Sequence, residues 1–470
     1  MRRRPGHGAA ATAVAACLLA ACSPAPLPQP AVDRSAAVGA DTTLVIDNAR
    51  VFDGERDLGV VALVIRNGII ERIEPAGVGV SPAETRRVDY RGHWVIPGLI
   101  NAHAHVGNTL GTEHGDRFYT RDIVIRDLRQ FQAYGITTVV ALGLNGEGFT
   151  DIRDEVATTP ALGAQLLGAG AGVGTPEGAP PAANMGLQRD AVARPADAVS
   201  AREAVRAQGA IGVDLIKLWV DDLGGKAPPM TAEVYRAAID EAHRHGLLVA
   251  AHIHDLAPAA DLVASGVDII AHGVRDRPVD DALVAAMRAA GTGYIATLQI
   301  DEANYVYAEH PEWLETPFLR NALPAAVHAR WSDPQWRADT LADPATQRAR
   351  DAVAMNLRNL GTLRAAGIAI GFGTDAGALP HRVPGFAEHR ELELMQQAGY
   401  SPQQALTVAT RDSARLLRLE DRGLLAPGRR ADFVVLGQDP LLDIRNTRAI
   451  EAVWQAGVQV GGPVRDYANE

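Results

Sequence analysis

Cysteine is almost absent from this sequence. The 470 residues include two, Cys17 and Cys22, and both lie within the first 22 positions. The remainder of the chain therefore has no disulfide, no cysteine nucleophile and no cysteine ligand for a metal ion. Basic residues are also fewer than acidic ones, which gives a formal net charge of -11. That balance argues against a nucleic-acid partner, since such proteins usually present a basic face.

Long apolar runs are missing too, apart from one at the N-terminus. This absence excludes a membrane protein with several spanning helices. The chain has 47% hydrophobic and 21% charged residues and a mean hydropathy of -0.03. These values are those of an ordinary globular protein and exclude disordered and collagen-like chains. The length is sufficient for one large domain and one smaller domain.

The N-terminal run has the pattern of an export signal. Met1 is followed by three Arg, then by a stretch rich in Ala, Val and Leu, and then by Leu19-Ala20-Ala21-Cys22. A basic segment, a short apolar segment and small residues before a cleavage site are typical of secretory signal peptides. The last four residues also resemble the bacterial lipobox, in which the cysteine is acylated and becomes the new N-terminus.

We therefore expect a lipoprotein signal peptide over 1–22, a lipid on Cys22, and a tether rich in Pro and Ala over 23–41. The protein would then be exported and would contact the membrane only through its lipid. Ser23 after the cysteine favours the periplasmic face of the outer membrane if the cell is Gram-negative. A plain signal peptide or a short anchor helix is the alternative.

Short β-type runs lie near both ends of the remaining chain. Residues 42–97 hold several of them, and Asn67-Gly68 between two apolar runs is a strong signal for a β-hairpin. Residues 424–470 repeat this style, with Gly457 at a turn. We expect these two segments to form one small composite β-sandwich domain.

The middle of the chain, 98–423, alternates apolar runs with helical patterns such as 232–243 and 280–290. The apolar runs are 99–103, 136–142, 164–169, 214–220, 247–253, 268–273, 292–298 and 368–374. Eight such units predict an α/β fold with a (β/α)₈ TIM barrel; a doubly wound open sheet is the alternative. Residues 301–350 are expected to form an insertion or lid over the site, and 171–186 a second loop.

Potential metal ligands fall at the ends of these runs. His103 and His105 end the first run, where alternation places both side chains on one face. Imidazole pairs held in this way suit Zn²⁺, Fe or Mn. His252, His272 and Asp375 close the fifth, sixth and eighth runs. Because the carboxyl ends of barrel strands meet at one mouth, these side chains predict a metal site.

Lys217 is the sixth candidate, a single cation inside the apolar fourth run. A bare lysine that faces a core is energetically expensive. Reaction with CO₂ would convert it to a carbamate, an anion able to bridge two metal ions. The alternative is an ion pair with Asp221 or Asp222.

The combination of these features resembles the amidohydrolase superfamily, in its imidazolonepropionase-like and Xaa-Pro dipeptidase-like branch. The motifs that carry the resemblance are Pro-Gly-Leu-Ile-Asn-Ala-His-Ala-His at 97–105, Gly-Val-Asp-Ile-Ile-Ala-His-Gly at 266–273, Gly-Thr-Asp-Ala-Gly at 373–377, and the segment 424–436. The resemblance covers about 42–465. One position departs from the family: Asn101 stands where an aspartate is usual.

The resemblance implies a ligand set and a reaction. His103, His105 and Asp375 would hold one divalent ion, His252 and His272 a second, and carbamylated Lys217 would bridge the two, with Zn²⁺ as the expected metal. A hydroxide between the ions would attack an amide of a dipeptide, N-acyl amino acid or cyclic amide, and Asp375 would act as general acid and base. A one-metal version applies if Lys217 is not carbamylated.

Four further residues are candidates for substrate contacts: His254, Arg275, Arg277 and His381. Arginine at the mouth would suit a substrate carboxylate, which its fork binds through two hydrogen bonds. The sequence leaves other functions open on the same scaffold. These are hydrolysis of an ester, lactone or organophosphate, a deamination, and ligand binding without turnover. Assembly into a homo-oligomer is also left open.

Overall fold

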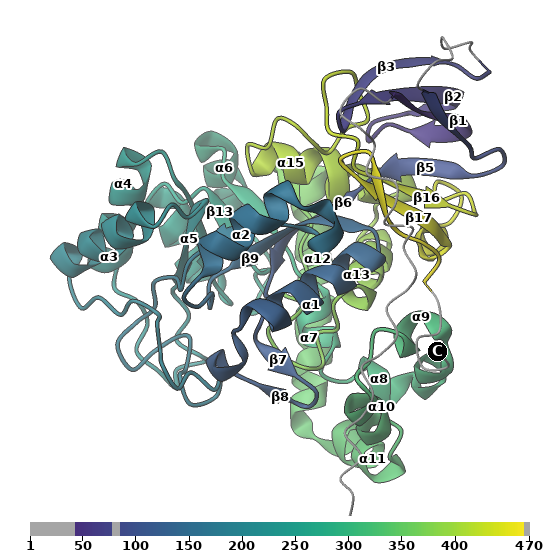
Figure 1. Cartoon of the computed structure of the whole chain (residues 1–470). Helices are drawn as coiled ribbons and strands as arrows, with labels where there is room; N and C mark the ends of the chain where they lie inside the picture. The colour runs from purple at the N-terminus through teal and green to yellow at the C-terminus, as the bar shows by residue number, and fades with distance from the viewer. Residues whose placement is uncertain (1–42, 78–84, 465–470) are drawn as a thin grey trace, which may run out of the picture.

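The computed structural model describes residues 43–77 and 85–464 as two parts, a ring of parallel strands surrounded by helices and a sheet built from both ends of this region (Figure 1). The predicted signal peptide, Cys22 and the tether lie outside the described residues. Within the described ranges, no helix has both the length and the apolar character needed to cross a membrane.

The sheet at the upper right of Figure 1 joins the two ends of the described chain. Its strands are β1 (Thr43–Phe52), β2 (Asp57–Arg66), β3 (Ile69–Pro75), β4 (Thr85–Asp89), β5 (Trp94–Pro97), β16 (Phe433–Leu436), β17 (Ile450–Gln455) and β18 (Val458–Gly461). Their order is β18-β17-β16-β5-β1-β2-β3, with β4 also on β1. Buried Leu44, Ile46, Phe433 and Trp454 belong to its own apolar core. This arrangement confirms the composite sheet; the predicted domain boundaries stay a prediction.

Two tight turns within this sheet occur where the sequence indicates them. Asn67 and Gly68 connect β2 to β3 with φ angles of 53° and 75°, and Ala456 and Gly457 connect β17 to β18 with 50° and 72°. Positive φ at both central residues gives a turn whose twist matches that of the strands. The hairpin at Asn67-Gly68 is therefore confirmed.

The barrel strands coincide closely with the eight predicted runs. They are β6 (Leu99–Ala104), β9 (Ile136–Leu142), β10 (Gln165–Ala169), β11 (Leu215–Trp219), β12 (Leu248–His252), β13 (Ile269–Ala271), β14 (Gly293–Ile295) and β15 (Ile370–Gly371). They pair in parallel as β10-β9-β6 and β11-β12-β13-β14-β15. Nearly all of their residues are buried, as expected for a parallel sheet covered on both faces.

Main-chain hydrogen bonds join these two sheets into a closed ring. On one side, Val173 N–H donates to the carbonyl of Lys217 at 2.8 Å, just beyond the end of β10. On the other side, Ala102 N–H donates to the carbonyl of Phe372 at 2.8 Å, which links β6 to the segment after β15. The TIM barrel is thereby confirmed, and the open-sheet alternative is wrong.

Helices cover the outside of the ring. They are α1 (Arg121–Ala133), α2 (Phe149–Thr158), α3 (Ala198–Ala210), α4 (Ala232–Arg244), α5 (Leu256–Ala264), α6 (Asp281–Ala290), α12 (Pro344–Ala365), α13 (Phe386–Gln397), α14 (Pro402–Thr407) and α15 (Ser413–Leu416). Their ends follow local sequence. The Asp280 side chain accepts from Leu283 N–H at 2.8 Å to cap α6, which ends at Gly291 with φ 72°.

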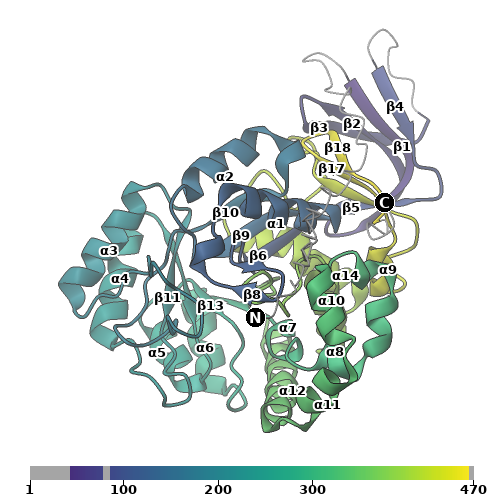
Figure 2. The ribbon, with the colours of Figure 1, turned by 60° about the horizontal axis from the view of Figure 1, so that its bottom comes forward.

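The segment 301–350 is a helical insertion rather than a structureless loop. It contains α8 (Val306–Glu309), α9 (Pro317–Arg320), α10 (Ala325–Trp331) and α11 (Pro334–Ala342), and α7 (Gln299–Glu302) leads into it. Tyr134, next to α1, donates through its hydroxyl to Phe318 O at 2.8 Å, and Gln130 Nε2 donates to Ala322 O at 3.0 Å. Figure 2 shows this group beside the end of the barrel at which the hairpin of β7 (Thr109–Leu110) and β8 (Glu113–His114) lies.

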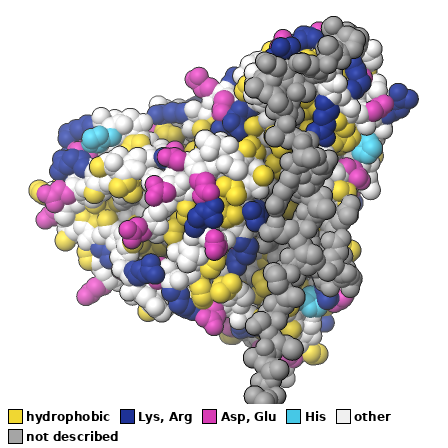
Figure 3. Space-filling model, viewed as in Figure 1, with side chains coloured by type: hydrophobic (Ala, Val, Ile, Leu, Met, Phe, Trp, Pro, Cys, Tyr) yellow, Lys and Arg dark blue, Asp and Glu magenta, His cyan; other side chains and the backbone are white. Residues whose placement is uncertain are grey.

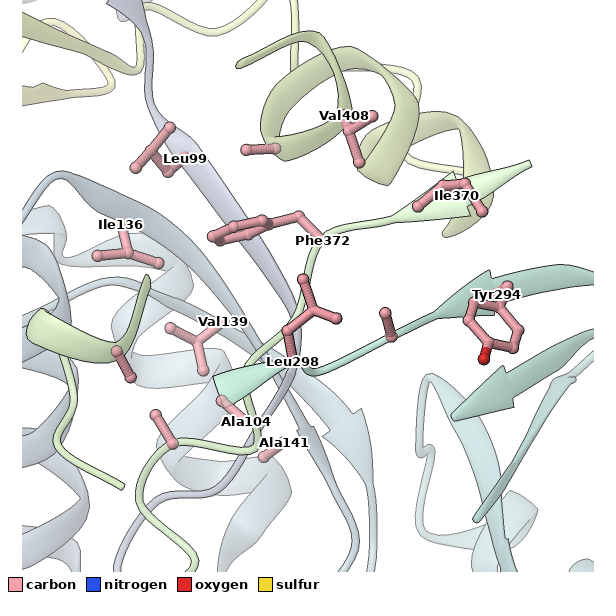
Figure 4. Close-up of a cluster of buried hydrophobic side chains, with 14 of the residues drawn as sticks. Leu99, Ala104, Ile136, Val139, Ala141, Tyr294, Leu298, Ile370, Phe372 and Val408 are labelled. Atoms are coloured by element: carbon pink, nitrogen blue, oxygen red, sulfur yellow. The ribbon is translucent and has the colours of Figure 1, made fainter. Parts of the chain in front are cut away.

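The described part of the surface in Figure 3 carries acidic and basic side chains interspersed with one another. Inside, one apolar cluster draws its fully buried side chains from barrel strands alone, among them Leu215, Ala250 and Ile269. A second, larger cluster includes Val139 of β9, Phe372 just after β15 and Val408 of η4 (Val408–Asp412), as Figure 4 shows. Apolar side chains thus fill the interior of the barrel, and others pack the surrounding helices against its outer face.

Phe372 offers a test of this packing. The variant Phe372→Ala should lower the free energy of unfolding by about 3–5 kcal/mol, because a buried aromatic ring is replaced by a cavity. Urea unfolding of the metal-free protein measures the change. The matched control Leu442→Ala removes a side chain that is 80% exposed and should alter stability by less than about 0.5 kcal/mol. Equal effects of the two variants would contradict the packing described.

Candidate metal centre

The six predicted ligands converge at one end of the barrel interior. Side chains alternate between the two faces of a strand, so Lys217 lies on the same face as Leu215, and His252 on the same face as Ala250. Leu215 and Ala250 belong to the apolar cluster formed by barrel strands alone, so Lys217 and His252 also face that cluster. His103 lies on β6, and His105 follows that strand directly. The remaining two, His272 and Asp375, lie just beyond β13 and β15.

Asp375 is surrounded by three of the histidines. Its Oδ1 lies 3.1 Å from Nε2 of His103 and 3.1 Å from Nε2 of His105. One ligand atom from each of His103, His272 and Asp375 lies within 4.8 Å of the others, and all three residues are buried. A carboxylate and neutral imidazoles at such spacing match the ligands that Zn²⁺ and similar ions prefer.

The second half of the centre adjoins the first through His272. Its ring centroid is 4.4 Å from that of His103 and 4.5 Å from that of His252. Lys217 is fully buried, and its charge acts on His103, His252 and His272. All six groups therefore belong to a single polar cluster.

Hydrogen bonds fix the tautomers of two of the histidines. Nδ1 of His105 lies 3.2 Å from the carbonyl of Gly143, which can only accept, so Nδ1 carries the proton. The hydroxyl of Thr297 donates to the carbonyl of Ala296 at 2.8 Å and accepts from Nδ1 of His272 at 2.9 Å. Both histidines therefore present an unprotonated Nε2, the atom that would coordinate an ion.

Two members of the cluster lack the partners that buried polar groups require. Within the described part of the chain, neither ring nitrogen of His103 has a hydrogen bond, and neither does Nζ of Lys217. Such orphaned groups cost about 1–3 kcal/mol each. The expected alternative, an ion pair of Lys217 with Asp221 or Asp222, is not formed. The donor set therefore fits a bound metal ion, which would satisfy the nitrogen of His103 directly.

Burial sets the protonation of these groups. It lowers the pKa of His103 to about 3, that of Lys217 to about 7 and that of His272 well below its ordinary value. Burial alone would raise the pKa of Asp375, but the charge of Arg382 and the adjacent imidazoles of His103 and His105 hold it well below its ordinary value. Neutral imidazoles and an ionised carboxylate are the forms that bind metal.

The backbone at two of the candidate ligands is strained. His272 has φ 73° and Asp375 has φ 61°, a region that costs a non-glycine residue about 1–3 kcal/mol. Beside them, Gly373 leaves room for His103, since a Cβ there would lie 2.8 Å from the Cβ of His103. The rest of the barrel maintains the strain at His272 and Asp375. Their backbone conformation directs both side chains into the cluster.

The four candidates for substrate contacts lie in different environments. His254 is 42% exposed and its Nδ1 lies 2.6 Å from Asp255, while Arg277 is 68% exposed and pairs with Asp276. Neither joins the cluster. The Arg275 side chain is 5% exposed and pairs with Asp301 at 3.1 Å. His381 lies within electrostatic reach of Asp375, and burial lowers its pKa to about 3.

Two charged residues at the centre were missed by the sequence analysis. Asp221, just beyond β11, has Oδ2 at 3.2 Å from Nε2 of His252. Burial would raise the pKa of Asp221, but the hydrogen bond and charge of His252 lower it to about 2. Arg382 forms an ion pair with Asp375. The sequence indicates Asp221 only as a partner of Lys217, and the position next to His381 is the one signal for Arg382.

Asn101 supports the centre through a buried network that includes Glu388 of α13. Its Nδ2 donates to Glu388 Oε1 at 2.7 Å, and its Oδ1 accepts from His103 N–H at 3.0 Å. Thr374 Oγ1 donates to the same Glu388 oxygen at 2.6 Å and accepts from Ala376 N–H at 3.1 Å. The network therefore braces the backbone on both sides of the cluster.

Comparisons with known proteins agree with this geometry. The sequence profile of the Amidohydrolase family matches residues 94–464. An uncharacterised protein of Mycobacterium tuberculosis is 28% identical over 374 residues, which is 77% of this chain and 84% of that protein. The imidazolonepropionase of Deinococcus deserti is 39% identical over 99 residues, or 20% of this chain and 24% of that enzyme. The crystal structure of a candidate prolidase from Bifidobacterium longum superposes with a TM-score of 0.70 at 27% identity, covering 90% and 95% of the two chains.

The pairing of Asn101 with Glu388 predicts the outcome of an exchange. Asn101→Asp places two carboxylates against each other and should weaken metal binding by about 10–100-fold, the usual effect of disturbing groups that support ligands. Adding Glu388→Gln restores an amide opposite a carboxylate and should recover most of that affinity. Competition with a metal-binding dye measures both. Failure of the double variant to recover, with its circular dichroism spectrum unchanged, would contradict this role.

Proposed function

Because the chain belongs to the amidohydrolase family, and is therefore a hydrolase that acts on carbon–nitrogen bonds, we propose that its six-residue cluster binds two divalent ions and hydrolyses an amide of a small molecule. The observation that carries this proposal is the buried, unpaired imidazole of His103 beside Asp375 and His272. Nothing else in the cluster satisfies that ring, and a metal ion would.

Each ligand has an assigned place. His103, His105 and Asp375 would hold one ion, His252 and His272 the other, and Lys217 would bridge them as a carbamate. Burial lowers the pKa of Lys217 to about 7, so a large fraction of its amine is unprotonated at neutral pH. That amine can add to CO₂, forming an N–C bond and releasing a proton. Zn²⁺ is the expected ion for this set of nitrogen and oxygen ligands.

The chain's own residues then supply proton transfer. Bound ions of this kind lower the pKa of a coordinated water to about 7 and polarise a carbonyl group. The Asp375 carboxylate is ionised and in contact with the cluster, so it can accept a proton and deliver it to the leaving nitrogen. The prolidase and imidazolonepropionase similarities support dipeptides, N-acyl amino acids and cyclic amides as substrate classes.

Metal removal tests the proposal directly. Dialysis against a chelator should abolish hydrolysis of the best substrate in a panel of dipeptides, N-acyl amino acids and cyclic amides. Return of about two equivalents of Zn²⁺ with bicarbonate should restore it. Elemental analysis should find about two ions per chain in the restored protein. Undiminished hydrolysis by protein shown to be free of metal would contradict the proposal.

Two variants separate the roles of the ligands. Lys217→Ala should reduce the metal content, because the bridge is lost, whereas one ion in both the variant and the wild type would exclude a bridging lysine. Asp375→Asn removes the proton carrier at nearly constant volume and should lower kcat by at least about 100-fold. A wild-type rate in Asp375→Asn would exclude its acid–base role.

We also propose that the protein is exported and anchored by a lipid on Cys22, on the basis of the lipobox-like sequence 19–22. In a bacterial host, Cys22→Ala should move the protein from the membrane fraction to the soluble fraction, because no acyl chain can then be attached. Fractionation and immunoblotting measure the distribution. Unchanged membrane retention of the variant would rule out the lipid as the anchor.

A further inference from the structure

Arg382 contacts the cluster through the oxygen of Asp375 that does not face the histidines. Its Nη1 donates a hydrogen bond to Oδ2 of Asp375, whereas Oδ1 of the same carboxylate faces His103 and His105 at 3.1 Å. The Arg382 side chain is only 15% exposed. The guanidinium therefore touches the carboxylate to which we assign the proton transfer.

The loop that bears Arg382 holds its backbone in place. Arg382 N–H donates to the carbonyl of Leu379 at 3.0 Å, and its own carbonyl accepts from Gly377 N–H at 2.9 Å. Gly377 has φ 85°, and a Cβ at this position would lie 2.1 Å from the carbonyl oxygen of His105. The loop thus approaches the end of β6 as closely as a glycine allows. The backbone of Arg382 is therefore held at a fixed position relative to the candidate ligands.

Hydrogen-bonding capacity near this position is unused. Nε of Arg382 is buried and has no partner among the described residues, and the same holds for Nε2 of the adjacent His381. Buried donors without acceptors are unfavourable, so they point to a group that arrives with the ligand. A guanidinium offers five N–H groups in a planar fork that matches a carboxylate.

We propose that Arg382 binds a carboxylate of the substrate, and that the substrate is an amide whose leaving amine is an α-amino acid. This inference rests on the proposed function, because it requires Asp375 to protonate the leaving nitrogen. The α-carboxylate of an amino acid is one carbon away from that nitrogen. The Arg382 guanidinium, which contacts the proton donor Asp375, is therefore close enough to bind that α-carboxylate.

The reaction is a simple hydrolysis. The acyl carbon gains the oxygen of water, the C–N bond breaks, and the nitrogen receives a proton from Asp375, giving a carboxylic acid and a free amino acid. Dipeptides and N-acyl amino acids belong to this substrate class. Amides without a carboxylate next to the scissile nitrogen do not.

Matched substrates test the assignment. N-acetyl amino acids and their C-terminal amides contain the same scissile bond, and release of acetate reports its cleavage in both. The metal-loaded wild type should prefer the acids over the amides in kcat/KM by about 100-fold, as expected for a buried charge pair. Arg382→Gln should bring this ratio close to one by raising KM for the acids, whereas any effect on kcat through Asp375 should be the same for acids and amides. Arg382→Lys should give an intermediate ratio, because lysine keeps the charge and lacks the fork.

The controls separate this role from a structural one. Loss of a merely structural arginine would lower kcat/KM for acids and amides in the same proportion and leave their ratio at the wild-type value, and that result would overturn the inference. Arg91→Gln removes an arginine that is 79% exposed, between β4 and β5 of the composite sheet, and should change kcat/KM for neither substrate. Equal kcat/KM for acids and amides in the wild type would also overturn it, while leaving the proposed hydrolase function intact.

Binding provides a second readout that does not depend on turnover. In Asp375→Asn, calorimetry should show tighter binding of an N-acetyl amino acid than of its amide, and Arg382→Gln added to that variant should abolish the difference. If the wild type hydrolyses neither compound, the proposed function fails for this substrate class. The calorimetric comparison then decides the role of Arg382 alone, since equal binding of acid and amide would overturn it.

Discussion

The contact between the first and last strands of the barrel is the constraint on which the rest of the centre depends. Ala102 donates to the carbonyl of Phe372, and Asp375 N–H donates to the carbonyl of His103 at 2.7 Å. These bonds close the ring and also bring His103 and Asp375 together. Without closure there would be no shared position for the ligands, because they come from strands distributed over the whole barrel.

Burial gives this cluster its chemical character. Burial removes the nitrogens of His103 and the amine of Lys217 from bulk solvent, so His103 is neutral and a large fraction of Lys217 is unprotonated at neutral pH. The positive φ angles of His272 and Asp375 add to the free energy stored at this position. A protein tolerates such costs where function requires them, and the apolar packing around Phe372 and Leu215 offsets them.

The sequence predicted the barrel and the six side chains that converge in the cluster because both depend on local pattern. Apolar runs of strand length mark β9 and β12, and polar residues at their ends mark the mouth. The role of Arg382 and the pairing of Asn101 with Glu388 could not be predicted, since they depend on how a loop and a helix pack across the barrel. For the same reason, the sequence could not show that Arg277 is exposed and pairs with Asp276.

The pairing of β5 with β16 has a consequence for the order of events during synthesis. Val95 and Val435 are register partners, although almost the entire barrel separates them along the chain. Until the last strands have left the ribosome, β5 has an unpaired edge and the apolar core around Leu44 lacks Phe433 and Trp454. Folding can therefore begin with the barrel helices and strands, but the composite sheet is completed last. Until then, the unpaired edge of β5 is open to pairing with other chains.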